Sequence, residues 1–161
     1  AEARHRIDDF WHPYHEALQG QLDQAHLMFG QAILIDCHSM PHEAMDSVAS
    51  RGLRRPEVVL GDRFGAAADG EIVDRIEAAF TRAGLMVTRN TPFAGAYITQ
   101  AYGRPSRGRH AVQIEIDRAL YMNERLIRPN GNFEAFRRLM CGVIQEITEI
   151  GRAQAMPLAA E

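Results

Sequence analysis

The chain has 161 residues, 46% of them hydrophobic, which suits one domain with a substantial buried core. Its formal net charge is −3 and no basic block stands out, so we expect neither nucleic acid nor a membrane as a partner. All 18 cationic residues are arginine, which leaves no lysine for a nucleophile or a Schiff base. Cys37 and Cys141 lack paired spacing, and the sequence shows neither a signal peptide nor a membrane-spanning stretch, so we expect a cytoplasmic protein.

Apolar residues recur at helical spacing over residues 6–29, which predicts a helix that Pro13 kinks or restarts and Gly30 ends. An apolar, partly β-branched run over 32–36 predicts a buried strand, and a shorter run over 58–60 predicts another. The remaining predicted elements are a helix over 69–84, a strand over 85–88, a long loop over 90–109, a strand over 111–116, a short helix over 117–122 and a helix over 132–153. This alternation predicts an α/β fold with a mostly parallel mixed sheet flanked by helices.

The first candidate site follows the first predicted strand, where a buried run stops in the polar segment Asp36-Cys37-His38-Ser39. Asp36 and His38 share the alternation of the strand, so both side chains are expected on one side. Neutral imidazole is a common zinc ligand, and a neighbouring carboxylate can orient it. The alternative is a capped turn in which His38 is merely exposed. Cys37 has the opposite parity and is expected to pack inward.

The second candidate is Glu115, which shares one side of the strand over 111–116 with Gln113. A glutamate in an otherwise apolar strand is costly to bury unless a charge or a hydrogen bond meets it. A metal with its bound water would meet it, and such a glutamate makes a natural general base. The alternatives are a half-exposed edge strand or a structural pair with Arg118.

Two further segments follow predicted strands. In Gly61-Asp62-Arg63-Phe64-Gly65, the glycines allow tight turns and Arg63 can clamp a carboxylate with two hydrogen bonds. The alternative is an ordinary surface turn. The loop over residues 90–99 mixes small, aromatic and hydroxyl side chains, which suits either a substrate-covering loop or a simple connection.

Taken in order, four segments resemble the N-formylglutamate amidohydrolases, also called N-formylglutamate deformylases. They are Leu-Ile-Asp-Cys-His-Ser-Met-Pro, Gly-Asp-Arg-Phe-Gly, Asn-Thr-Pro-Phe-Ala-Gly-Ala-Tyr-Ile-Thr and His-Ala-Val-Gln-Ile-Glu-Ile-Asp-Arg-Ala-Leu-Tyr-Met. The resemblance implies a zinc-dependent hydrolase with a zinc-carboxypeptidase-like α/β fold. The reaction it implies converts N-formyl-L-glutamate and water to formate and L-glutamate, usually at the end of histidine degradation.

The resemblance also implies roles for individual residues. His38 matches a zinc-ligating histidine, and Glu115 matches the glutamate that activates the attacking water and passes its proton to the departing amine. The substrate, a small N-acyl acidic amino acid, would have its carboxylates bound by arginine. Four residues fall where substrate contacts are expected: Arg63, Asn90, Tyr97 and Arg118.

Two features depart from the family pattern. The first metal ligands of the family lie upstream, in a His-Ser-Gly-like segment and a following acidic residue that this sequence lacks. We therefore expect residues 1–161 to be the C-terminal portion of a single domain, without its N-terminal strands and inactive on its own. Ala96 stands where the family commonly has glycine, which would be costly if its φ is positive. The alternatives are a hydrolase of another N-acyl amino acid, a carboxypeptidase-like peptidase, or a non-catalytic binding module without metal.

Overall fold

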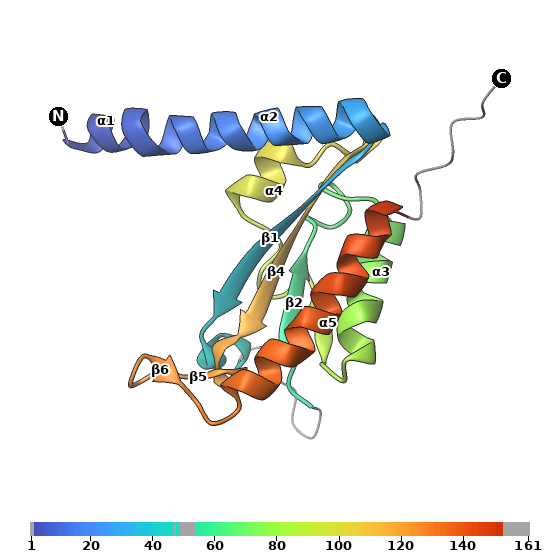
Figure 1. Ribbon diagram of the computed structural model, residues 1–161. Helices are drawn as coiled ribbons and strands as arrows, with labels where there is room; N and C mark the ends of the chain where they lie inside the picture. The colour runs from blue at the N-terminus through green and yellow to red at the C-terminus, as the bar shows by residue number, and fades with distance from the viewer. Residues whose placement is uncertain (1, 47, 49–53, 153–161) are drawn as a thin grey trace.

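The computed structural model describes residues 2–46, 48 and 54–152 of the chain (Figure 1). Its elements are α1 (Glu2–Arg6), the π-helical turn η1 (Ile7–Trp11), α2 (His12–Phe29), β1 (Ala32–Met40), the 3-10 helix η2 (His42–Met45), β2 (Val58–Gly61), α3 (Gly70–Arg82), β3 (Val87–Arg89), α4 (Tyr97–Tyr102), the 3-10 helices η3 (Pro105–Arg107) and η4 (Arg118–Leu120) on either side of β4 (Arg109–Asp117), β5 (Met122–Asn123), β6 (Arg128–Pro129) and α5 (Phe133–Arg152). The last residue of the helix predicted over 132–153 lies outside the described residues.

The main sheet has four strands in the order β1-β4-β2-β3. β1 pairs with β4 in parallel and β2 pairs with β3 in parallel, whereas β2 and β4 run antiparallel. The predicted α/β fold with a mixed sheet flanked by helices is therefore confirmed. Within the described residues β1 is an edge strand of this sheet.

Long-range pairing makes two strands longer than the sequence predicts. β1 and β4 each run for nine residues and pair along their whole length, from Ala32 with Arg109 to Met40 with Asp117. The polar segment after the predicted first strand is therefore part of β1, because β4 satisfies its backbone groups. The predicted loop over 90–109 contains two short helices that the sequence did not predict, α4 and η3.

Two predicted helices differ from the structure in their details. The helix predicted over 117–122 shortens to η4, whose first turn is capped by the Asp117 side chain accepting from the Ala119 amide. The helix predicted over 6–29 passes through η1 before α2 begins. There the His12 amide bonds the carbonyl of Ile7, and Pro13 falls in the first turn of α2, where a missing amide costs little. Gly30, with φ of 70°, ends α2 as predicted.

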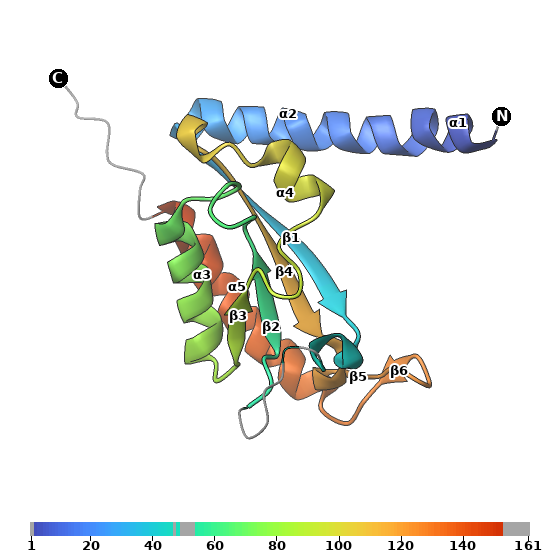
Figure 2. The same cartoon turned by 180° about the vertical axis from the view of Figure 1, so that it is seen from behind.

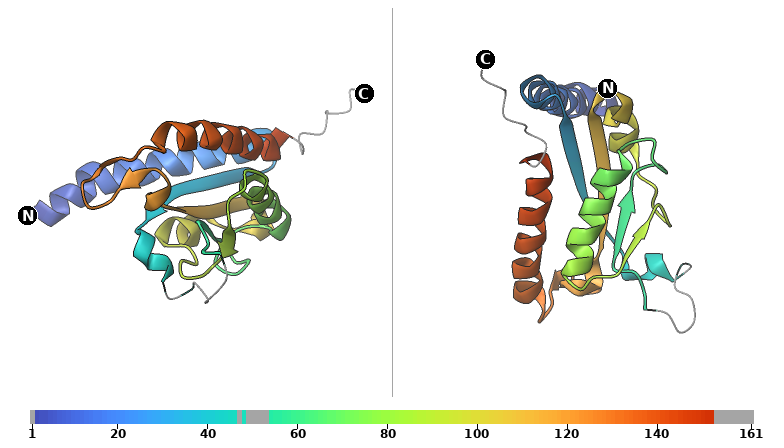
Figure 3. Two further views of the ribbon diagram at one scale, coloured as in Figure 1. Left: turned by 90° about the horizontal axis from the view of Figure 1, so that it is seen from below. Right: turned by 90° about the vertical axis from the view of Figure 1, so that its right-hand side faces the viewer.

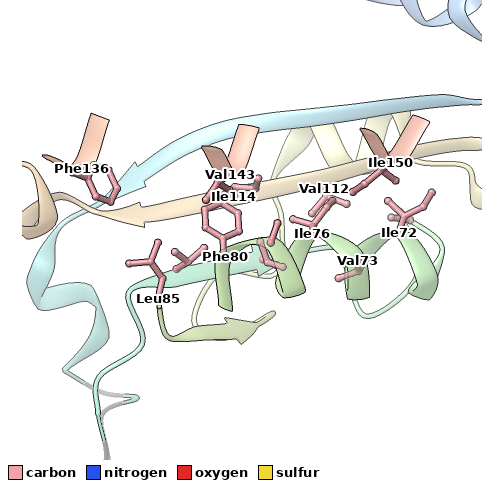
Figure 4. Close-up of a cluster of buried hydrophobic side chains, with 14 residues drawn as sticks. Ile72, Val73, Ile76, Phe80, Leu85, Val112, Ile114, Phe136, Val143 and Ile150 are labelled. Carbon is pink, nitrogen blue, oxygen red and sulfur yellow. The ribbon is translucent and has the colours of Figure 1, made fainter. Parts of the chain in front are cut away.

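One face of the sheet is covered by α3 and α5. Figure 4 shows side chains of both helices meeting Val112 and Ile114 of β4. This cluster buries fourteen side chains, which are Val58, Leu60, Ala68, Ile72, Val73, Ile76, Ala79, Phe80, Leu85, Val112, Ile114, Phe136, Val143 and Ile150. The predicted helix over 69–84 is observed as α3, whose apolar positions recur at helical spacing and whose first turn is capped by Asp69.

The opposite face of the sheet is covered by shorter elements. The left view of Figure 3 shows α5 on one side of β1 and β4, with α4 and η2 on the other. The long helix α2 crosses the amino ends of these strands (Figure 1). None of the helices in the described ranges has the length and apolarity needed to cross a bilayer.

Cys37 corrects one prediction. Its parity is opposite to that of His38, as expected, but its side chain is exposed and does not pack inward. The reason lies in the position of α5, which runs beside β2 and leaves the outer strand β1 partly uncovered (Figure 1). Ile33 and Ile35, on the same side of β1, are only partly buried.

Candidate active site at the carboxyl end of the sheet

The parallel register of β1 and β4 places His38 directly opposite Glu115. Both lie near the carboxyl ends of their strands, where ligands bind in open α/β sheets. His38 Nδ1 is 3.6 Å from Glu115 Oε1, and His38 Nε2 is 3.1 Å from Asp36 Oδ2. The predicted pairing of Asp36 and His38 on one side is confirmed, and one imidazole is flanked by two carboxylates.

The donor set beside His38 fits a cation only in part. Asp36 Oδ2 is buried without a hydrogen-bond partner among the described residues, although an imidazole nitrogen lies 3.1 Å away. An unsatisfied buried carboxylate oxygen is costly, and a bound cation would satisfy it. However, no three His, Cys, Asp or Glu side chains in the described part of the chain are placed to hold one metal ion. His38 can therefore supply one ligand, and a three-ligand zinc site is not built from these residues.

Glu115 is the buried carboxylate of this site, with 7% of its surface exposed. Burial raises its pKa, because the charged form loses hydration, and the nearby Asp36 charge acts in the same direction. His38, the Arg118 guanidinium and a hydrogen bond from Gln113 oppose this rise. A buried carboxylate with a raised pKa beside an imidazole is well suited to take up and release a proton.

The loop over residues 90–99 lies on the same face of the sheet as Glu115. Its Ala96 amide donates to the side-chain oxygen of Gln113, the neighbour of Glu115 on that face, at 2.8 Å. Figure 2 shows this loop crossing the sheet before it enters α4. Gly95 has the positive φ, 105°, whereas Ala96 has φ of −102°. Alanine at position 96 therefore carries no left-handed strain, contrary to the cost considered from the sequence.

Arg63 lies in a turn of three consecutive left-handed residues, with φ of 57° at Arg63, 55° at Phe64 and 84° at Gly65. Such a conformation costs non-glycine residues about 1–2 kcal/mol each. The Asp62 carboxylate accepts from the Gly65 amide at 3.1 Å, and the Arg63 amide donates to the loop carbonyl of Ala94 at 2.8 Å. The turn is therefore held by specific hydrogen bonds to the loop and to Asp62.

Asn90 supports this turn from the end of β3. Its side-chain oxygen accepts from the amides of Asp62 at 3.1 Å and Phe64 at 3.3 Å. Its side-chain nitrogen donates to the Asp62 carboxylate at 2.6 Å. The sequence draws attention to Asn90 but does not reveal this exchange with Asp62, because the two residues are 28 positions apart.

Arg118 and Tyr97 occupy different surroundings. The Arg118 guanidinium donates to the Ser39 hydroxyl and carbonyl, both at 3.1 Å, at the end of β1. Ser39 is the chain neighbour of His38, and the charge of Arg118 lowers the pKa of Glu115. Tyr97 begins α4, and its ring lies against the rings of Trp11 and His15, with centroids 5.9 and 5.3 Å apart. The structure thus groups Arg118 with Ser39 and Glu115, and Tyr97 with aromatic side chains of η1 and α2.

Comparison with known proteins matches the chain to one family. A family model described as N-formylglutamate amidohydrolase matches residues 1–122, which include every predicted site residue. The chain belongs to the N-formylglutamate amidohydrolase family. The resemblance read from the four sequence motifs is therefore confirmed.

Individual relatives agree with this assignment. N-formylglutamate deformylases of Pseudomonas putida and Pseudomonas aeruginosa are 34% and 36% identical, over 76% and 77% of this chain and 45% and 46% of their own lengths. The crystal structure of an N-formylglutamate amidohydrolase from Ralstonia eutropha superposes with a TM-score of 0.81 at 32% identity, covering 94% of this chain and 54% of that one. A gene product of Agrobacterium tumefaciens shares the fold, with a TM-score of 0.54 at 20% identity over 90% of this chain and 53% of that one. The chain thus spans about half the length of these relatives.

Proposed function

We propose that the protein to which this chain belongs hydrolyses N-formyl-L-glutamate to formate and L-glutamate. The observation that carries the proposal is the buried carboxylate of Glu115 facing the imidazole of His38 beneath the loop over 90–99. Both Pseudomonas relatives are named N-formylglutamate deformylases, which supports this substrate. Histidine degradation as the source of the substrate, and a cytoplasmic location, stay predictions.

Glu115 is proposed as the group that moves the proton. Its Oε1 accepts from the Gln113 amide at 2.8 Å, which leaves Oε2 to take a proton from the attacking water. As the water oxygen bonds to the formyl carbon, this proton is held on the carboxyl group. Glu115 then delivers it to the amide nitrogen while the C–N bond breaks, which yields formate and the free amine of glutamate. The raised pKa of Glu115 favours this uptake.

Zinc is proposed as the cofactor, with His38 as one ligand. Bound zinc would supply Lewis-acid chemistry, polarising the formyl carbonyl and acidifying the attacking water. Because the described residues do not form a three-ligand group, we propose that the other ligands come from a part of the family domain that this chain does not span. Among the described residues β1, which carries His38, is an edge strand of the sheet, and this position supports the same proposal. The chain of residues 1–161 alone is then expected neither to hold stoichiometric zinc nor to release formate.

Arginine side chains are proposed to bind the two carboxylates of the substrate. Arg118 lies at the carboxyl end of the sheet beside His38, and Arg63 is displayed by the left-handed turn against the loop. Asn90 and Tyr97 stay predicted substrate contacts. In the structure, Asn90 acts at least through the turn that presents Arg63, since its side chain bonds both Asp62 and Phe64.

The test uses the intact protein and measures both formate release and the zinc-to-protein ratio. Glu115→Gln keeps the shape of the side chain but removes the proton acceptor, so we expect kcat to fall at least about 10³-fold with zinc retained. His38→Ala is expected to lower the zinc content as well as the activity. Glu149→Gln, on the exposed side of α5, is the matched control and should leave both values unchanged.

Near-normal formate release by Glu115→Gln would refute the proposed role of Glu115. A preference for N-acetyl over N-formyl substrates would instead favour another N-acyl amino acid hydrolase.

A further inference from the structure

Gln113 is a buried amide whose orientation is fixed by its two neighbours. It is 4% exposed and lies on the same face of β4 as Glu115, two residues away. Its Oε1 accepts from the Ala96 amide at 2.8 Å, and its Nε2 donates to Glu115 Oε1 at 2.8 Å. A backbone amide can only donate and an ionised carboxylate can only accept, so the opposite orientation of the Gln113 amide would break both bonds.

The loop reaches Gln113 because the sheet has no side chain in its way. Gly61 of β2 is the register partner of Gln113. A Cβ at Gly61 would lie 2.5 Å from the Gly95 nitrogen and 2.7 Å from the Ala94 carbonyl carbon. The loop backbone therefore packs directly on β2, and this close approach brings the Ala96 amide to the Gln113 side chain.

The loop segment that meets Gln113 is itself anchored on both sides. The Ala94 carbonyl accepts from the Arg63 amide at 2.8 Å, and the Ala96 carbonyl accepts from the Thr99 hydroxyl at 2.8 Å. The Ala96 amide is therefore a fixed donor. Through Gln113, its position determines where one oxygen of Glu115 is held.

Gln113 also keeps Glu115 apart from His38. The same Glu115 Oε1 that accepts from Gln113 is 3.6 Å from His38 Nδ1, just beyond hydrogen-bond distance. Without the Gln113 bond, this oxygen would be left as a buried acceptor without its donor, with the His38 imidazole nitrogen 3.6 Å away. The carboxylate would then turn toward His38 and accept a hydrogen bond from that ring nitrogen.

We propose that Gln113 is a positioning residue that couples the loop over 90–99 to the carboxylate of Glu115. It holds Oε1 of Glu115 in a fixed place, leaves Oε2 directed to the reaction, and keeps the imidazole of His38 available. The contribution to catalysis rests on the proposed function, whereas the coupling itself is a property of the folded chain.

Two substitutions separate the two hydrogen bonds of Gln113. Gln113→Met has a similar volume and loses both. Gln113→Glu can still accept from the Ala96 amide, but it presents an oxygen to Glu115 in place of a donor. Gln145→Met is the matched control, because Gln145 is an exposed glutamine on α5. The zinc-to-protein ratio is measured for each variant to separate positioning from metal loss.

In the intact protein, we expect both Gln113 variants to lower kcat by about 10- to 100-fold with KM changed less than about twofold, since misplaced catalytic groups reduce turnover rather than binding. Hydrogen exchange of the Ala96 amide should accelerate at least about tenfold in Gln113→Met and stay near the wild-type rate in Gln113→Glu. The carboxylate carbon resonance of Glu115 should shift in both Gln113 variants. It should not shift in Gln145→Met.

The two kinds of measurement fail separately. If the unmodified protein releases no formate from N-formylglutamate, the proposed function is wrong, and the exchange rate and the Glu115 resonance still decide whether the coupling exists. An unchanged Glu115 resonance in both Gln113 variants overturns the coupling, whatever the activity. A loss seen only in KM, with kcat retained, overturns the positioning role.

Discussion

The two faces of the sheet differ in what covers them and in what they bury. On one face, α3 and α5 enclose a continuous cluster of apolar side chains around Val112 and Ile114 (Figure 4). On the other face, β1 carries Asp36 and His38, and β4 carries Glu115. This face is covered mainly by loop backbone and short helices (Figure 2). Alternation along β4 lets one strand serve both faces.

This difference separates the origin of stability from the origin of chemistry. Apolar burial is non-directional, so the α3–α5 face tolerates exchange among side chains of similar volume. The polar face depends on individual hydrogen bonds, each with a defined donor and acceptor. Substitutions on the first face should therefore change the free energy of unfolding, and substitutions on the second should mainly change geometry at Glu115.

The largest effect is expected from Phe80, a fully buried side chain of α3 in the apolar cluster. Phe80→Ala should lower the free energy of unfolding by about 3–5 kcal/mol, because it removes buried apolar surface and leaves a cavity. Urea unfolding of the variant measures this loss. Phe80→Leu should cost less and gives a second variant if Phe80→Ala does not fold, and Thr81→Ala, on the exposed side, is the control. A loss below about 1 kcal/mol for Phe80→Ala would contradict a tightly packed face.

An intermediate effect is expected from Asn90, on the side of the sheet that carries the loop. Asn90 has φ of 58°, and its side chain makes three hydrogen bonds to Asp62 and Phe64. Asn90→Ala should cost about 2–3 kcal/mol, since it loses these bonds and places alanine in a left-handed conformation.

Asn90→Gly divides that cost into its two parts. Glycine adopts a positive φ freely, so this variant should be more stable than Asn90→Ala by about 1 kcal/mol yet less stable than the wild type. Unfolding free energies of the two variants are compared under the same conditions. Wild-type stability in Asn90→Gly would show that the hydrogen bonds to the turn contribute nothing.

The sequence predicts each face well where the pattern is local. Alternation over 110–116 correctly placed Gln113 with Glu115, and helical spacing correctly identified the buried side of α3. Long-range features were not predictable in this way. The extension of β1 through His38 depends on pairing with β4, about 77 positions away in the register of Asp36 with Gln113.

The site residues that the sequence missed share this limitation. The sequence predicts only a turn around Asp62, whereas the role of Asp62 depends on Asn90, which is brought to it by the pairing of β2 with β3. The sequence predicts only the side of the strand on which Gln113 lies, because its second partner is a backbone amide that no side-chain pattern reveals. Cys37 had the correct parity but the wrong burial, since parity does not state how far α5 extends over β1.

The smallest effect is expected from His110, a buried polar residue on the side of β4 that faces α3 and α5. Its Nδ1 accepts from the Asp69 amide at 3.1 Å, so protonating that nitrogen would break the bond, and burial lowers the pKa of His110 below its ordinary value of 6.5. The unfolded chain therefore binds a proton at a higher pH than the folded chain does. The stability linked to neutral His110 is fully present above pH 6.5 and is lost as the pH falls through the lowered pKa.

His110→Asn retains an acceptor for Asp69 without a titrating ring, so the difference in unfolding free energy between pH 7.5 and pH 5.5 should shrink by about 1 kcal/mol or less. An unchanged difference would show that His110 does not contribute to the pH dependence of stability, which would then arise from other groups.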